Sequence, residues 1–133
     1  MYGNILLILH QEFFLIKNNM NIQILFWPEA LEFLNSIPAK DRAKIFFNLA
    51  KIQQGFRDND LFKKLTGTDI WEIRTLFNST CYRLFAFWDS EEESLIVATH
   101  GIIKKTQKTP AKEITKAEDI RRIYYDEKRA NKQ

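Results

Sequence analysis

Glycine and proline are scarce in this sequence, with 4 Gly and 3 Pro among 133 residues. Hydrophobic residues make up 45% of the chain and aromatic residues 14%. This composition excludes disorder as the main state and is typical of a compact folded domain. A chain of this length buries roughly two-thirds of the surface that its unfolded form exposes, so it needs no disulfide or metal to hold its core. We see no linker, internal repeat or second domain.

Cysteine is almost absent, since Cys81 is the single one. One cysteine cannot form a disulfide within the chain, and no group of Cys and His residues has the spacing of zinc ligands. We therefore expect a cytoplasmic protein without a metal or other cofactor. Cys81 itself is expected to be buried packing rather than a nucleophile.

Long hydrophobic runs are also missing. Residues 5–9 and 13–16 are apolar, but His10, Gln11 and Glu12 separate them, so neither run is long enough to span a bilayer. No basic region or small-residue cleavage site marks a signal peptide, and we expect no membrane role. Residues 1–19 are either an upstream extension of the reading frame or an extra strand or helix. Residues 20–133 are expected to form the single domain.

Acidic residues are absent from one stretch, residues 94–112, although the whole chain carries a formal net charge of only +3. The stretch contains four lysines: Lys104, Lys105, Lys108 and Lys112. A local basic strip in a modestly basic protein favours an anionic partner such as nucleic acid, with the lysines contacting the phosphate backbone.

Hydrophobic periodicity predicts an α+β fold. A strand over residues 22–26 precedes two helices, the first opened by Pro28 and the second ended by Gly55. Beyond Gly67 the period changes to two, which predicts three antiparallel strands joined by short polar turns. A last helix begins near Thr109 and Pro110. The predicted elements are a strand at 22–26, helices at 28–34 and 38–54, strands at 70–77, 80–89 and 94–103, and a helix from 109. The fold is thus an N-terminal strand and a helical hairpin packed on an antiparallel meander, with a C-terminal helix.

The two hairpin turns predict which residues face each other across the strands. A turn at Asn78 and Ser79 places Arg74 opposite Arg83, and a four-residue loop at 90–93 places Arg83 opposite His100. Like charges opposite each other destabilise a sheet unless something offsets them. A bound polyanion would do so, and Glu72, on the same face as Arg74, is the internal alternative.

Such a row favours phosphoryl chemistry. The sequence has no G-x-S-x-G, G-x-G-x-x-G or Walker motif, which removes the usual signals of acyl transfer, dinucleotide binding and nucleotide hydrolysis. Arg74 and Arg83 could bind phosphate oxygens and stabilise the charge that develops on phosphorus. His100 could carry a proton when a ribose 2′-OH attacks the adjacent phosphate, or it could be an ordinary buried histidine. The sheet aromatics Trp71, Phe85, Phe87 and Trp88 are expected in the core rather than under bases.

A set of short motifs in this chain resembles a known family. They are Lys64-Leu65-Thr66-Gly67, Trp71-Glu72-Ile73-Arg74, Tyr82-Arg83, and the run from His100 to Pro110 that reads HGIIKKTQKTP. Together they resemble the HigB-like, or phage Gp49-like, branch of the RelE/ParE toxin superfamily of bacterial type II toxin–antitoxin systems. The likeness covers about residues 20–120.

This resemblance implies a RelE-like fold and an mRNA interferase: a metal-independent endoribonuclease that cuts mRNA in the 70S ribosome and inhibits translation. By position, Arg74, Arg83 and His100 correspond to catalytic residues, and Lys104, Lys105, Lys108 and Lys112 to RNA-binding residues. The resemblance also implies a cognate helix-turn-helix (HigA-like) antitoxin, with operator DNA bound only by the toxin–antitoxin complex.

Two alternatives stay open at this stage. ParE-type members share the fold and inhibit DNA gyrase, so the fold does not decide the activity. A non-catalytic nucleic-acid-binding protein that serves only in repression is the other alternative.

Overall fold

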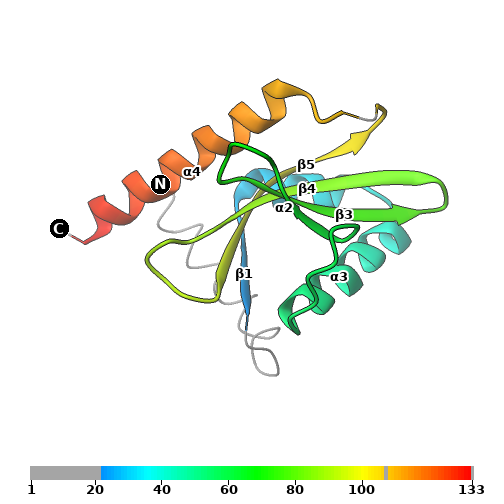
Figure 1. Cartoon of the computed structure of the whole chain (residues 1–133), viewed down its shortest axis with the longest axis horizontal. Coiled ribbons are helices and arrows are strands. Elements are labelled where there is room, and N and C mark those ends of the chain that lie inside the picture. Colours follow the sequence, from blue (N-terminus) through cyan, green and yellow to red (C-terminus); the bar gives the residue numbers. More distant parts are fainter. Residues whose placement is uncertain (1–21, 107, 133) are drawn as a thin grey trace.

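The computed structural model describes residues 22–106 and 108–132 and has an α+β architecture (Figure 1). Within these residues the elements are β1 (Gln23–Phe26), α2 (Pro28–Ser36), α3 (Ala39–Gln53), β2 (Phe62–Lys64), β3 (Trp71–Phe77), β4 (Thr80–Trp88), β5 (Leu95–Lys104) and α4 (Ala111–Asn131). The predicted order is confirmed, and β2 is an addition too short to produce a periodic signal. The expectations for residues 1–19 lie outside the described residues. In the described part, no helix has the length and apolar character needed to cross a membrane.

The described strands form one sheet in the order β1-β5-β4-β3-β2. Strands β2 to β5 are antiparallel neighbours, as the meander requires, whereas β1 pairs with β5 in parallel. Along the chain, two helices and the strands β2 to β4 lie between β1 and β5. This long crossover allows the two strands to run in the same direction. The sheet is therefore mixed.

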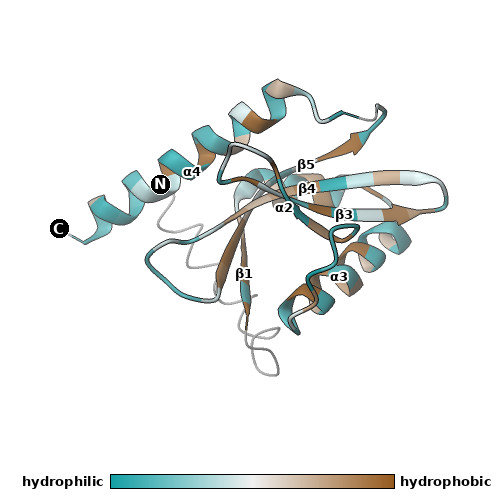
Figure 2. Ribbon diagram, in the orientation of Figure 1, coloured by the Kyte–Doolittle hydropathy of each residue, from teal (hydrophilic) through white to brown (hydrophobic). Residues whose placement is uncertain are grey.

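The two faces of the sheet are covered by different helices (Figure 1). On one face Tyr82 packs against Phe33 of α2, with ring centroids 6.2 Å apart, and its hydroxyl hydrogen-bonds to Asp41 of α3. On the other, Phe87 packs against Tyr124 of α4 at 5.5 Å. We call the face covered by the helical hairpin of α2 and α3 the hairpin face, and the opposite face the α4 face. Figure 2 shows that β1 and β5 are largely hydrophobic whereas α4 is mostly hydrophilic, consistent with a helix that buries one narrow stripe.

The hairpin face brings α2 into close contact with β5 at Gly101. A Cβ atom added there would lie 2.3 Å from Cδ2 and 2.7 Å from Cγ of the Phe33 ring. A Cβ atom at this position would therefore require a new χ1 rotamer of Phe33 or a shift of α2. Gly101 thus permits the close approach of α2 to the sheet.

The C-terminal half of α4 is anchored by the buried carboxylate of Asp89, just after β4. Tyr124 donates a hydrogen bond to Oδ2 at 2.6 Å, Lys128 donates another at 2.8 Å, and the backbone N–H of Glu91 binds Oδ1 at 2.6 Å. Burial by itself raises the pKa of this carboxyl, but the bonds from Lys128 and Tyr124 outweigh it and hold the pKa below its usual value. The loop between β4 and β5 is thereby tied to the helix.

The register of β4 against β3 matches the prediction, with Arg74 opposite Arg83. The register of β4 against β5 does not. Arg83 faces Ile102, and His100 faces Phe85 instead. The loop after β4 is one residue longer than predicted, because Asp89 pairs with Leu95 and Ser94 takes a positive φ of 67°. A β-bulge between Phe85 and Ala86 adds a second extra residue on β5. The predicted row Arg74–Arg83–His100 is therefore wrong at His100.

Candidate functional site

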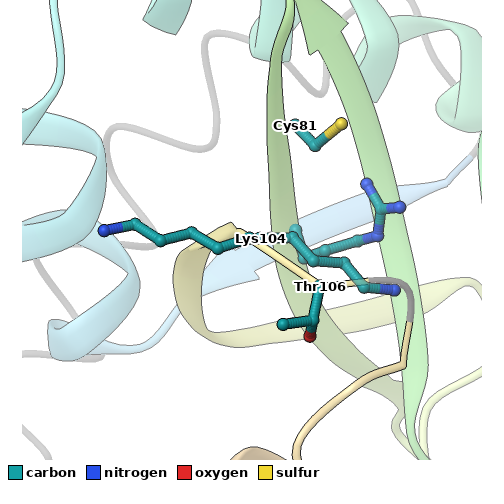
Figure 3. A pocket seen from close by; sticks show the side chains of 5 residues that line it. Cys81, Lys104 and Thr106 are labelled. Carbon is teal, nitrogen blue, oxygen red and sulfur yellow. The ribbon is translucent and has the colours of Figure 1, made fainter.

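A pocket of about 320 Å³ lies on the α4 face, at the end of the sheet that α4 leaves uncovered. Its lining residues are Cys81, Arg83, Lys104, Lys105 and Thr106. Figure 3 shows Cys81 on a strand of the sheet, with Lys104 and Thr106 beside it at the end of β5. Three of the five lining side chains are basic and none is acidic. The pocket is therefore suited to an anion.

Strand alternation explains why these side chains meet. Cys81 and Arg83 are two residues apart on β4, so both point to the same face. Lys104 faces Cys81 directly across the β4–β5 pair. Lys105 and Thr106 follow as β5 ends. The predicted residues Arg83, Lys104 and Lys105 are thus brought together.

A fully buried carboxylate, Glu72, lies beside the pocket on the same face. Its Oε1 is 3.2 Å from Nε of Arg74 and 3.5 Å from Nε of Arg83. Its Oε2 accepts a hydrogen bond from the hydroxyl of Thr109, which precedes α4. Glu72 thus offsets the repulsion between the two arginines, as the internal alternative supposed. One carboxylate does not neutralise two guanidinium groups and Lys104, so positive charge remains for a ligand.

Burial lowers the pKa values of two basic residues of the pocket. For Arg83 the charge of Glu72 opposes this effect. The Nη1 atom of Arg83 donates a hydrogen bond to the carbonyl of Tyr82 at 3.1 Å. The Nε atom of Arg83 is buried and makes no hydrogen bond within the described residues. Burial also lowers the pKa of Lys104, and the charges of Arg83 and Arg74 lower it further while Glu72 opposes them. Lys104 is therefore easier to deprotonate than an ordinary lysine.

His100 does not line the pocket. Its ring is only 2% exposed and stacks on Phe85, with centroids 4.8 Å apart. Nδ1 lies 3.0 Å from the hydroxyl of Thr99, and Nε2 lies 3.1 Å from Oε1 of Glu113 on α4. Both ring nitrogens are thus in use, and the first turn of α4 lies over Nε2.

The surroundings of His100 favour the neutral ring. Burial is the largest influence and lowers its pKa, while the hydrogen bond to Glu113 opposes this and Lys116 lowers the pKa further. In the neutral form with the proton on Nε2, this atom donates to Glu113 and Nδ1 is an acceptor, so that the hydroxyl of Thr99 would donate to Nδ1 in place of the carbonyl of Phe85 at 3.3 Å. His100 therefore joins β5 to α4 in this conformation.

The remaining predicted site residues lie around the pocket rather than in it. Arg74 is half-buried and donates through Nε to Glu72 and through Nη1 to the carbonyl of Asn59, at 3.4 Å. Lys108 and Lys112 are exposed beyond the end of β5. Within residues 22–106 and 108–132, no group of three or more His, Cys, Asp or Glu side chains is placed to hold a metal ion.

Two expectations about uncharged side chains have different outcomes. Phe85 and Phe87 are core residues, as predicted, and the half-buried Trp71 stacks on Phe62 at 4.5 Å. Cys81, however, is not core packing, since it is half-buried and lines the pocket. Its position two residues from Arg83 was the signal that could have revealed this.

Comparison with known families identifies the family of this chain. Residues 32–122 match the family model described as Phage derived protein Gp49-like (DUF891), which covers more than half of the chain and the whole pocket. No curated protein sequence matches the chain significantly. Because the match extends from α2 into α4, the chain belongs to the Gp49-like family, the family of HigB-like toxins of the RelE type.

Proposed function

We propose that this toxin is a ribosome-dependent mRNA endonuclease that inhibits translation. The observation that carries the proposal is the convergence of Arg83, Lys104 and Lys105 on one pocket without an acidic lining residue. An RNA phosphate is the anion that such a pocket would bind, because guanidinium and ammonium groups match its charge and oxygen geometry.

In the proposed reaction the ribose 2′-oxygen forms a bond to the adjacent phosphorus and the bond from phosphorus to the 5′-oxygen breaks. The products are a 2′,3′-cyclic phosphate and a 5′-hydroxyl. Negative charge grows on the non-bridging oxygens in the transition state. Arg83 and Lys104 would stabilise this charge from fixed positions, which is the largest contribution that a preorganised site makes.

Protons must leave the 2′-hydroxyl and reach the 5′-oxygen. Lys104 would accept the first proton in its neutral form, which burial and the nearby arginines favour, and the resulting ammonium group would then stabilise the charge on the phosphate oxygens. His100 keeps its proposed role as a proton carrier only if the first turn of α4 moves and frees Nε2 from Glu113. Arg74 would act beside Arg83 through their shared contact with Glu72. Lys108 and Lys112, both exposed, would contact the RNA backbone.

The proposal includes the partners expected of such a toxin. A cognate helix-turn-helix antitoxin would block the pocket, and the two proteins together would bind operator DNA. The 70S ribosome would present the mRNA as a single strand.

Primer extension on a reporter mRNA in a bacterial translation extract tests this function. The wild-type protein should produce cuts at codon positions only when ribosomes translate. Arg83→Ala should abolish the cuts because it removes the central phosphate contact. Arg122→Ala is the matched control, since that arginine lies on α4 with 65% of its side chain exposed and pairs with Asp119.

Full cutting by a folded Arg83→Ala protein would refute the assigned site. If the wild-type protein cuts no mRNA while translation continues, the endonuclease proposal fails. A supercoiling assay with purified gyrase would then separate a gyrase inhibitor from a non-catalytic repressor.

A further inference from the structure

Leu76 is an apolar side chain left exposed next to the basic pocket. It belongs to β3 and is 65% exposed. Its residue number has the same parity as Arg74, so it points to the α4 face. Leu76 is the last but one residue of β3, beyond the part of the strand that pairs with β2, so it lies at the edge of the sheet face with its apolar surface open to a ligand of the neighbouring pocket.

The register places Leu76 in line with the pocket. Leu76 is directly opposite Cys81, and Cys81 is directly opposite Lys104. Neighbouring strands are about 4.8 Å apart, so the backbones of Leu76 and Lys104 are separated by roughly 10 Å. Arg83 is the diagonal neighbour of Leu76 across the β3–β4 pair, at about 7–8 Å between Cα atoms.

An apolar surface beside a phosphate-sized cationic pocket matches the chemistry of one nucleotide. The phosphate carries the charge, and the base offers a flat, weakly polar face. In a duplex that face is covered by stacking, whereas in a single strand it is free. A peptide segment would need both an acidic and an apolar side chain to do the same, and it is the competing occupant that the experiment below distinguishes.

We propose that Leu76 is the base-contacting part of this site, so that the site takes single-stranded nucleic acid with a phosphate in the pocket and the neighbouring base on Leu76. This inference rests on the proposed function in one respect, the binding of a nucleic-acid phosphate by Arg83 and Lys104. It adds a residue that influences which bases of the single strand are preferred.

The chain provides a matched control in Ile103. This residue is 48% exposed on β5 and lies one position before Lys104. It pairs with Tyr82, so it points to the hairpin face, away from the pocket. Ile103→Ala therefore removes a similar apolar area at the same end of the sheet without touching the proposed base position.

Binding of short fluorescent oligonucleotides by the full-length protein tests the inference. The first oligonucleotide is a single strand with 2′-deoxy sugars, so it lacks the attacking hydroxyl and is not cleaved. The second has the same length and backbone but carries no bases. Leu76→Ala should weaken binding of the base-containing strand by roughly fivefold or more, which corresponds to about 1 kcal/mol, and leave the abasic strand unchanged. Ile103→Ala should change neither affinity.

Other outcomes overturn the inference. Unchanged affinity of Leu76→Ala for the base-containing strand would show that no base lies on Leu76, and equal losses on both strands would assign it to backbone contact or folding. The inference also fails if the wild-type protein prefers a duplex of the base-containing oligonucleotide, or if it binds neither single strand. Cleavage in the translation extract is measured separately, so mRNA cutting with an unchanged Leu76→Ala affinity would retain the endonuclease and reject the base contact. Base-dependent binding without mRNA cutting would retain the base contact and reject the endonuclease.

Discussion

The Nε2 atom of His100 lies 3.1 Å from Oε1 of Glu113, so a buried ring of β5 holds the first turn of α4. The other end of the helix is held by Asp89 through Tyr124 and Lys128. The two attachments respond differently to acid. Protonation of His100 keeps the Nε2–H donor toward Glu113 but places a charge on a buried ring, whereas protonation of Asp89 removes the carboxylate that Tyr124 and Lys128 bind.

Stability should fall as the pH is lowered through 6.5. Burial lowers the pKa of His100 in the folded state, so the unfolded chain binds a proton first. This contribution is complete above about pH 6.5, where His100 is neutral in both states, and it is lost toward lower pH by at most about 1.4 kcal/mol per pH unit. Urea unfolding at pH 7.5 and 5.5 measures the change. His100→Gln should show a shallower pH dependence, and an identical dependence in both proteins would contradict the prediction.

Removing the charge of Glu72 should destabilise the fold. Glu72→Gln leaves Arg74 and Arg83 facing each other without the buried carboxylate, and we expect a loss of roughly 1–3 kcal/mol in the free energy of unfolding. Asp69→Asn is the control, because this carboxylate is 71% exposed and lies 3.7 Å from Arg121. Its loss should stay within about 0.5 kcal/mol. Similar losses for the two variants in denaturant titrations would count against a central role for Glu72.

Gly101→Ala should push α2 away from the sheet. The added Cβ would lie 2.3 Å from Cδ2 of Phe33, and we expect a loss of about 1–3 kcal/mol. A double-mutant cycle with Phe33→Ala measures the clash directly. Without the ring, Gly101→Ala should cost at least about 0.5 kcal/mol less. Strictly additive effects would mean that the ring is not what limits the size of residue 101.

Cys81 should report occupancy of the pocket. It is the single cysteine of the chain and lines the pocket beside Arg83, so alkylation of the protein by iodoacetamide measures this position alone. A saturating 2′-deoxy oligonucleotide should slow the reaction in the wild-type protein. The Arg83→Ala variant should show little protection at the same concentration. An alkylation rate unaffected by bound oligonucleotide would indicate that the strand binds elsewhere.

Much of the fold could be predicted from the periodicity of the sequence. The stripe that includes Ile45, Leu49 and Ile52 is helical, and all three residues are buried in α3. The short turn at Asn78 and Ser79 allowed the Arg74–Arg83 pair to be predicted, since both turn residues have the positive φ that a tight hairpin requires.

The position of His100 could not be predicted in the same way. A loop of five residues and a loop of four have nearly the same composition, and a bulge leaves no mark in the alternation of hydrophobic residues. The extra loop residue and the bulge together shift the partner of Arg83 by two residues, from His100 to Ile102. His100 therefore lies on the predicted face but in the wrong row. Burial by α4 was also invisible, because Glu113 reaches His100 only through the tertiary fold.

The bulge between Phe85 and Ala86 has a consequence for how the length of this hairpin can vary. Compared with a four-residue loop and a regular strand, the extra loop residue reverses which face each side chain of β5 points to. The extra residue at the bulge restores the original faces from His100 onward. A deletion within the loop leaves these pairs in place if the loop simply shortens. If the loop instead kept five residues, β5 would slide by one residue, so that Lys104 would turn to the hairpin face and Lys105 would take its place. Homologous toxins that keep the basic pocket should therefore place length changes within the loop, or change β5 between the loop and Lys104 by even numbers of residues.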